Sequence, residues 1–195
     1  MPDTAETTTG RDRIVACALE LLHADRPDEL SIREVSRRAG VASGTPYHHF
    51  GDKAGLLAAC ARVGWDDLTA RLQAVDAEGA IVDQISALAA EYATFAFENP
   101  GCYRLMMARR FDDPSRFADL DARRAVALEA VIGRLASSPS RPAEKSRAMA
   151  MWSMMHGYVM LRLDGAATGD GDPEAQLQAL AEMVARIAVL SWGGC

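Results

Sequence analysis

Cysteine is scarce in this sequence, and its placement excludes two kinds of site. Cys17, Cys60, Cys102 and Cys195 are scattered along 195 residues without a Cys-x-x-Cys pair. A disulfide-stapled domain needs closely spaced cysteines, and a closed zinc site needs clustered ligands. We therefore expect reduced thiols, no structural metal and no cofactor.

A long apolar run is also missing. The most apolar stretch, Met149 to Leu161, is flanked by Arg147 and Arg162. It is too short to cross a bilayer, which takes about 20 residues. The opening residues, MPDTAETTTG, are polar and do not form the apolar core of a secretory signal. We expect residues 1–10 to be a disordered tail, and the protein to be cytoplasmic with no membrane partner.

Aromatic residues make up only 6% of the chain, whereas alanine and leucine dominate long stretches. This composition favours helices over a β-sandwich. Proline and glycine punctuate the apolar stretches at 99–101, 111–115, 137–142 and 164–173. The sequence predicts an all-α protein with a three-helix head over 11–57 and a helical body over 58–195. A long connecting helix, which opens at Gly51 and Asp52 and ends before Gly79, joins the two.

Positive charge is in deficit, with 21 basic residues against 27 acidic ones and a net charge of −6. The distribution is uneven, because residues 31–53 hold four basic side chains against two acidic ones. Binding of an anion depends on the local field and not on the total charge. The N-terminal region therefore remains a candidate for nucleic-acid binding.

Residues 31–40 have the signals of a short helix with both ends marked. Ser31 and Glu34 have the spacing of a capping box, in which each side chain bonds the other residue's backbone amide. Gly40 is suited to the left-handed conformation that ends a helix. We expect a sharp turn at this glycine.

The stretch GVASGTPYHHF, residues 40–50, predicts a second short helix. Ser43 is placed to cap it, and Pro46 fits its first turn, where amides have no intrahelical acceptor to lose. We expect Phe50 in the core and the ring of Tyr47 packed, with its hydroxyl pointing outward. Two short helices joined at a glycine form a helix-turn-helix arrangement.

The tandem histidines do not predict a metal site. Adjacent residues on a helix diverge by about 100°, so His48 and His49 cannot chelate one ion together. A helical-bundle metalloenzyme is the competing class, but it needs paired Glu-x-x-His motifs, and the sequence has none. It also has no Gly-x-Ser-x-Gly or P-loop string. We expect no enzymatic activity.

The segment SIREVSRRAGVASGTPYHHFGDKAGLL resembles the DNA-binding head of the TetR family of bacterial transcription regulators. The C-terminal part is similar to a subset of that family with a Trp-x-x-x-His-Gly stretch, here Trp152, His156 and Gly157. The resemblance implies a homodimeric repressor that leaves a palindromic operator when a small-molecule effector binds. A thiol-responsive regulator with the same head is the alternative.

The resemblance, together with the rules of groove recognition, places the DNA contacts in the head. A recognition helix reads base edges through residues near its N-terminus. Gly44 lets the backbone approach DNA, and the Thr45 hydroxyl and methyl suit base or phosphate contacts. The expected DNA-binding residues are Ser31, Arg33, Ser43, Gly44, Thr45, Tyr47, His48 and Lys53.

The body offers two further expectations. The helix over 143–164 is apolar nearly all round, so a second subunit is expected to cover one side of it, with the last two helices sealing a homodimer. Methionine and aromatic residues can line an adaptable effector pocket, although core packing explains any one of them equally well. The candidate pocket residues are Tyr92, Phe95, Tyr103, Met106, Met107, Trp152, Met155 and His156.

Overall fold

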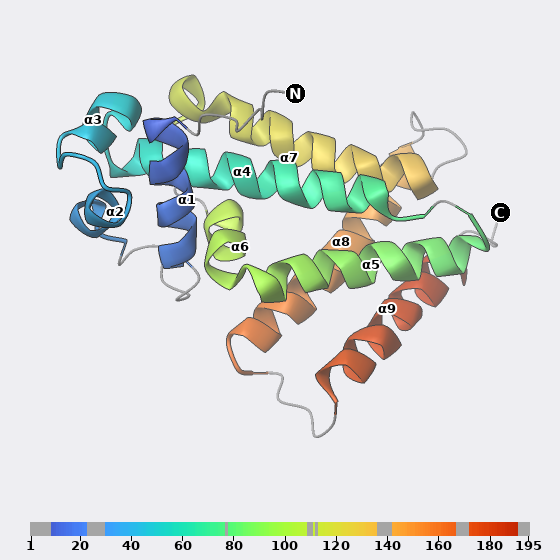
Figure 1. Ribbon diagram of the computed structural model, residues 1–195. Coiled ribbons are helices and arrows are strands. Elements are labelled where there is room, and N and C mark those ends of the chain that lie inside the picture. The colour runs from blue at the N-terminus through green and yellow to red at the C-terminus, as the bar shows by residue number, and fades with distance from the viewer. Residues whose placement is uncertain are drawn as a thin grey trace, which may run out of the picture. The chain divides into compact units, whose positions relative to one another are not determined.

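The structure is a computed structural model that describes residues 9–22, 30–76, 78–108, 111, 113–135, 142–166 and 172–190. Within these ranges every regular element is an α-helix (Figure 1), so the all-α prediction is confirmed. None of the described helices is long and apolar enough to cross a membrane. Residues 1–8 of the expected tail and Cys195 fall outside the described residues.

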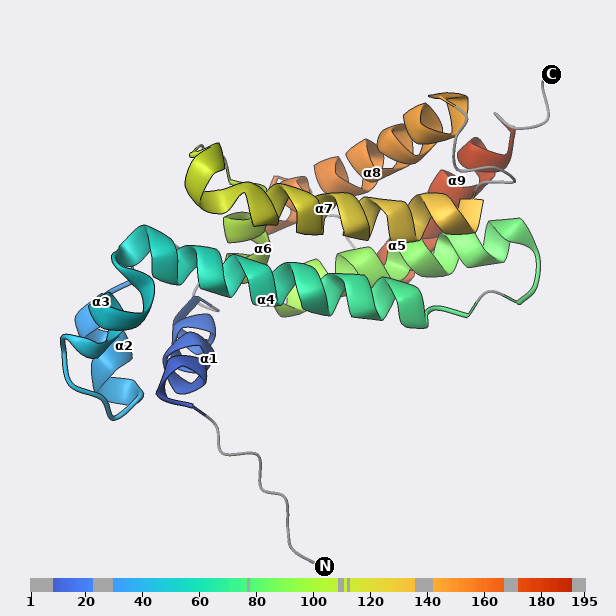
Figure 2. The ribbon, with the colours of Figure 1, turned by 90° about the horizontal axis from the view of Figure 1, so that it is seen from above.

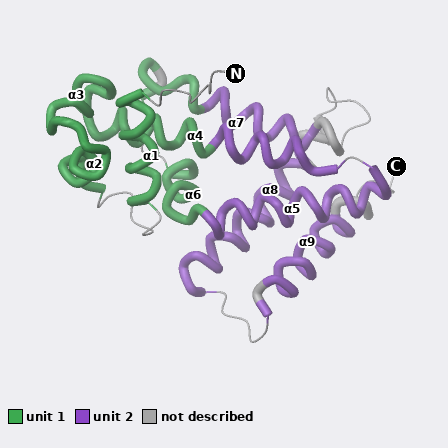
Figure 3. The backbone as a smooth tube through the Cα atoms, viewed as in Figure 1, with its two compact units in different colours: residues 1–64, 99–120 green, residues 65–98, 121–195 purple. Residues whose placement is uncertain are grey.

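The chain forms two compact units (Figure 3), residues 1–64 with 99–120 and residues 65–98 with 121–195. Unit 1 contains α1 (Gly10–Leu22), α2 (Ile32–Arg38), α3 (Thr45–Phe50), α6 (Pro100–Met107) and the starts of α4 (Lys53–Ala74) and α7 (Pro114–Leu135). Unit 2 contains the rest of α4 and α7 with α5 (Ile81–Glu98), α8 (Pro142–Leu163) and α9 (Pro173–Leu190). The functional boundary at residues 57 and 58 stays a prediction.

The core of unit 1 forms around one face of α1. Ile14, Ala18 and Leu22 recur at a spacing of four residues and are fully buried or nearly so. α1 packs against α2 and α3, which lie beside it at the start of α4 (Figure 2). Burying each large aliphatic side chain contributes about 1.5–3 kcal/mol. This packing supports two helices that are too short to be stable alone.

A glycine brings α6 against the end of α1. A Cβ at Gly101 would overlap the backbone carbonyl of Leu22, so no larger residue fits there without a backbone shift. The next residues of α6, Cys102, Tyr103 and Leu105, are buried. The close approach at Gly101 thus helps fix α1, on which the helix-turn-helix rests.

Unit 2 is organised around α5, which packs on α9 and on α8 (Figure 1). One face of α5 buries Ile85, Leu88 and Tyr92. α9 presents small residues, including Ala181 and Ala185, which are fully buried and allow close helix packing. Most charged residues of the two helices, including Asp83 and Glu182, are not buried, as expected for amphipathic helices.

Candidate DNA-binding site

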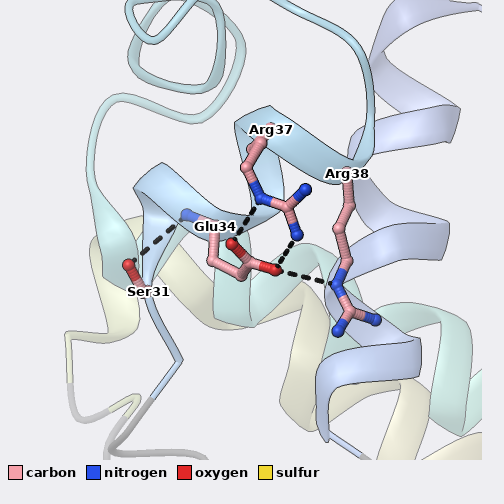
Figure 4. Close-up of polar contacts among 4 residues, drawn as sticks. All are labelled: Ser31, Glu34, Arg37 and Arg38. Carbon is pink, nitrogen blue, oxygen red and sulfur yellow. Dashed lines mark hydrogen bonds and ion pairs between the residues drawn. The ribbon is translucent and has the colours of Figure 1, made fainter.

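The start of α2 contains half of the predicted capping box. Ser31 is the N-cap in an extended conformation, and its Oγ accepts a hydrogen bond of 3.4 Å from the Glu34 amide. The second half of the prediction is wrong, because the Glu34 carboxylate turns along the helix toward Arg37 and Arg38 (Figure 4). Two guanidinium groups outcompete one backbone amide, since charge-assisted hydrogen bonds are the stronger ones.

Glu34 holds both arginines at short distances. Arg37 donates from Nε to Oε2 at 2.8 Å and from Nη2 to Oε1 at 2.6 Å, and Arg38 donates from Nε to Oε1 at 3.0 Å. The hydrogen bonds from Arg37, followed by those from Arg38, lower the pKa of Glu34 to about 2. The carboxylate is therefore ionised at neutral pH. It offsets part of the positive charge that the sequence places in this region.

The turn between α2 and α3 is built as predicted. Gly40 has a φ of +63°, the left-handed conformation that a glycine adopts without strain. The Gly40 amide bonds the Arg37 carbonyl at 3.3 Å, and the Val41 amide bonds the Ser36 carbonyl at 3.1 Å. These bonds close the end of α2 and turn the chain toward α3.

The recognition helix begins differently from the prediction. Gly44, and not Ser43, occupies the N-cap position, and no side chain caps the helix. A backbone turn from the Ala42 carbonyl to the Thr45 amide, at 2.9 Å, leads the chain into α3 instead. Pro46 lies in the first turn, as expected. The Ser43 side chain is exposed and its hydroxyl is not used as a cap.

The outward face of α3 differs from the prediction at Tyr47. Its side chain is 53% exposed, so the prediction of a packed ring is wrong. Pro46 and Phe50, one turn apart, are the buried residues of this short helix, and Tyr47 therefore points away from the core. Phe50 is in the core, as predicted, with the Arg11 guanidinium 5.3 Å from its ring centroid.

His48 and His49 are both exposed, with ring centroids 5.5 Å apart in an edge-to-face arrangement. Across the described residues no three metal-ligating side chains come together. Gly44 is also exposed, and Thr45 is half-buried. The accessible side chains of α3 are thus an aromatic hydroxyl and two imidazoles, groups that can donate hydrogen bonds to DNA.

The start of α4 is held by a contact that sequence reasoning missed. Asp52 caps the helix by accepting a 2.8 Å hydrogen bond from the Gly55 amide, and Arg116 binds the same carboxylate. The Arg116 contact, then the Gly55 amide, lowers the pKa of Asp52 to about 2. The half-buried Lys53 follows directly, at the N-terminal end of α4. Asp52 and Arg116 are 64 positions apart, and no local pattern connects them.

All the residues predicted to bind DNA lie in unit 1. Ser31 and Arg33 belong to the start of α2, residues 43–48 to α3 and the turn before it, and Lys53 to the start of α4 (Figure 1). Arg33 is exposed. The structure therefore gathers these side chains in one unit, and their individual contacts with DNA stay predictions.

The predicted pocket residues are divided between the two units. Tyr92, Trp152 and Met155 line a cleft in unit 2. Phe95 and His156 belong to unit 2 but do not line the cleft; burial lowers the pKa of His156. The remaining three, Tyr103, Met106 and Met107, belong to α6 in unit 1.

The cleft is narrow and is built from four helices of unit 2. Only about 50 Å³ of it is wide enough for a water-sized sphere. Trp152 donates a 2.8 Å hydrogen bond from Nε1 to the Tyr92 hydroxyl, which joins α8 to α5. The lining residues are Trp65, Leu68 and Leu72 of α4, Leu88, Ala89 and Tyr92 of α5, Arg124, Ala127, Leu128 and Val131 of α7, and Met151, Trp152 and Met155 of α8.

A helix-turn-helix unit combined with a helical unit that contains a narrow apolar cleft is typical of a DNA-binding regulator. Residues 14–60 match the family described as bacterial regulatory proteins, tetR family, and residues 85–184 match the tetracyclin repressor-like C-terminal domain. The chain belongs to the TetR family of transcriptional regulators. Members of this family are regulators and not enzymes, which confirms that part of the prediction. The Trp-x-x-x-His-Gly subset stays a prediction.

Similar proteins agree with this assignment. An uncharacterized HTH-type transcriptional regulator of Mycobacterium tuberculosis is 29% identical over 91% of this chain and 79% of its own length. A tetR-family regulator from Streptomyces coelicolor has a TM-score of 0.76 at 22% identity, with 95% of this chain and 85% of that one covered. A protein of unknown function from Rhodococcus sp. RHA1 has a TM-score of 0.77 at 24% identity, with 95% and 98% covered. These two structures support the fold alone.

Proposed function

We propose that this regulator is a homodimeric repressor that binds a palindromic operator and releases it when a small molecule enters unit 2. The proposal is carried by the exposed outward face of α3, where Tyr47 and His48 are accessible. The conformation of this face is fixed from behind by Pro46 and Phe50. A short helix held in this way is suited to the major groove. We also propose that the protein acts in the cytoplasm, where it meets DNA.

The proposal divides the predicted contacts between base edges and phosphates. Thr45, in the first turn of α3, is assigned to base edges, and Gly44 allows the backbone to come close. Lys53 and Tyr47 are assigned to phosphates, as are the hydroxyl of Ser31 and the amides around it. A phosphate at Lys53 also meets the N-terminal end of α4, where the helix dipole favours an anion.

The proposed dimer forms through α8 and α9. Four large apolar side chains of these helices are well exposed in the single chain: Met149, Leu161, Met183 and Ile187. Apolar residues clustered on helix surfaces mark interaction sites. A two-fold dimer would place two recognition helices about 34–36 Å apart, or a multiple of it, to match the half-sites of a palindrome.

The dimer is tested by sedimentation velocity at micromolar concentration. We expect Met183→Glu to shift the protein toward a monomer, because a charge would be buried at the interface. Val126→Glu is the matched control, since Val126 on α7 is 53% exposed, against 58% for Met183, and lies outside α8 and α9. A wild-type protein that sediments as a monomer would contradict the proposed dimer.

Regulation requires that the effector bind one state of the protein more tightly than the other. The cleft between α4, α5, α7 and α8 is the proposed effector site. A ligand larger than the present narrow space would move these side chains apart. Because α4 runs from unit 1 into unit 2, a movement of its unit 2 part would be transmitted along this helix to the head.

The DNA-binding role is tested by mobility-shift titration with genomic fragments, including the sequence upstream of its own gene. We expect one or a few fragments to shift specifically at moderate salt, with footprints of two-fold symmetry. A protein that shifts all fragments equally, or none, would contradict sequence-specific binding.

A further inference from the structure

We propose that the molecule bound in the cleft of unit 2 is an amphipathic anion: an apolar body carrying one carboxylate or sulfonate, with Arg124 as its charge partner. This inference rests on the proposed function, because it names the chemical class of the effector. Its test is arranged so that the two can fail separately.

The walls of the cleft select an apolar body. Trp65, Leu68 and Leu72 are almost completely buried on the α4 side, and aliphatic residues of α5 and α7 face the same space. Moving an apolar surface from water into such a site is favourable in proportion to its area. Met151 and Met155 are flexible and polarisable, so their side chains can adapt to a body that is wider than the present space.

The indole N–H on the wall of the cleft already has an acceptor. The Trp152 indole N–H donates to the Tyr92 hydroxyl at 2.8 Å. Because the two side chains are hydrogen-bonded to each other, this side of the cleft offers a ligand mainly their aromatic rings. A ligand gains stacking and apolar contact here without breaking a hydrogen bond.

Arg124 is the one fully charged residue in the lining of this cleft. Its Nη2 lies 2.8 Å from Oδ1 of Asp121, one turn earlier on the same helix. The two side chains are 53% and 72% exposed. A pair this exposed is strongly screened and contributes little to stability. The guanidinium can therefore turn to a ligand, while water solvates Asp121.

Two other arginines of unit 2 form ion pairs that connect one helix to another. Arg123 pairs with Asp66 and joins α7 to α4, and Arg71 bonds Glu98 at 2.6 Å and joins α4 to α5. Arg124 pairs only within its own turn among the described contacts, so its ion pair does not hold two helices together. A charged side chain in the lining of an apolar cleft, whose ion pair connects no second helix, is placed to select an acid over its neutral analogue.

The test uses two fluorescent probes that differ by one anionic group. 8-Anilino-1-naphthalenesulfonate carries a sulfonate on the ring system of neutral N-phenyl-1-naphthylamine, and both brighten in apolar sites. Titrations use the full chain with Trp192→Phe, so that the energy donors are Trp65 and Trp152 of the cleft wall. The effect of Arg124→Gln then assigns the bound probe to the cleft. We expect the sulfonate to bind about tenfold more tightly, as one charge-assisted hydrogen bond provides.

Arg124→Gln should remove that difference, weakening the sulfonate about tenfold and leaving the neutral probe unchanged. The matched control is Arg186→Gln, which removes the same charge from an exposed arginine of α9 that also pairs within its own helix, with Glu182. Thermal unfolding of both variants reports whether the fold is intact.

The outcomes separate the two proposals. If both probes bind equally well and Arg124→Gln changes neither, the anion class is wrong and the cleft remains the effector site. If neither probe is detected by energy transfer, the cleft is not a binding site, and the proposed effector response fails with it. If Arg186→Gln weakens the sulfonate as much as Arg124→Gln does, net charge and not Arg124 attracts the probe, and the assignment is overturned.

Discussion

The guanidinium of Arg116 donates two hydrogen bonds to the carboxylate of Asp52, from Nη1 to Oδ2 at 2.8 Å and from Nη2 to Oδ1 at 2.7 Å. Its Nη2 also lies 3.5 Å from the Phe50 carbonyl oxygen, at the end of the recognition helix. A residue at the start of α7 thus holds both the last residue of α3 and the cap of α4. Lys53, a predicted phosphate contact, is adjacent to this junction.

Arg116→Gln is expected to weaken operator binding several-fold, because the junction between α3 and α4 loses its bidentate support. Both partners are substantially exposed, so the fold should persist. Fluorescence anisotropy with a labelled operator measures the affinity. The double variant with Asp52→Asn should bind no worse than Arg116→Gln alone. Additive losses would mean that Arg116 acts on DNA directly through its charge.

The same ion pair should give stability a pH dependence. The pKa of Asp52 is lowered to about 2 from its ordinary value near 4, so the pair stabilises the fold fully above about pH 4 and is lost as the pH falls toward about 2. We expect the difference in unfolding free energy between wild type and Arg116→Gln to be constant near neutral pH and to vanish in acid. Urea unfolding at several pH values measures it. A difference that grows in acid would contradict the assignment.

Glu34→Gln should tighten DNA binding, and most of all non-specific binding. The substitution weakens the hold on Arg37 and Arg38, which then become available to phosphates. If both engage DNA, the slope of log affinity against log salt steepens by up to about 2. Glu20→Gln, which removes an exposed acid from α1, is the charge-matched control. Equal effects of the two variants would show that only net charge matters.

Thr45→Ala and Lys53→Ala should change DNA binding in different ways. Loss of Lys53 is expected to weaken binding to all sequences and to reduce the salt slope by about 1. Loss of Thr45 is expected to act at particular operator positions, costing about 1–3 kcal/mol there and relaxing specificity. A panel of single-base operator variants, titrated at three salt concentrations, distinguishes them. Identical profiles for the two variants would contradict the division into base and phosphate contacts.

Peroxide should leave DNA affinity unchanged. Burial and the neighbouring Cys102 raise the pKa of the Cys60 thiol to about 12, and both cysteines are buried in unit 1. A protonated, inaccessible thiol is a poor nucleophile. Mass spectrometry of the native protein after peroxide should find Cys60 unmodified. A loss of operator affinity that reductant reverses would instead support the thiol-responsive alternative.

Local signals in the sequence predicted some of the local structure. Ser31 at a helix start and Gly40 at a helix end each act through their own backbone neighbours, and both lie where expected. The packed ring of Tyr47 was a wrong prediction because periodicity in a helix of six residues does not decide which two positions are buried. Pro46, read as a tolerated residue, is one of them.

Contacts between distant residues could not be predicted. Arg116 and Asp52 meet because unit 1 brings the start of α7 to the head, and neither residue has a neighbour in sequence that signals the other. The cleft has the same origin. Leu68 and Leu72 of α4 are buried, but the gap beside them depends on how four helices fit together. Arg124 reads as a surface residue until that gap is seen.

The side chains that anchor α3 in its unit are different from those that the helix exposes for DNA recognition. Pro46 and Phe50 attach the helix to its unit, while Tyr47, His48 and His49 are exposed and make little contribution to the core. Substitutions at these three positions therefore leave the head intact while changing what it presents to a groove. A gene duplicate, or a designed library, could reach a new operator through these positions without first losing a stable protein.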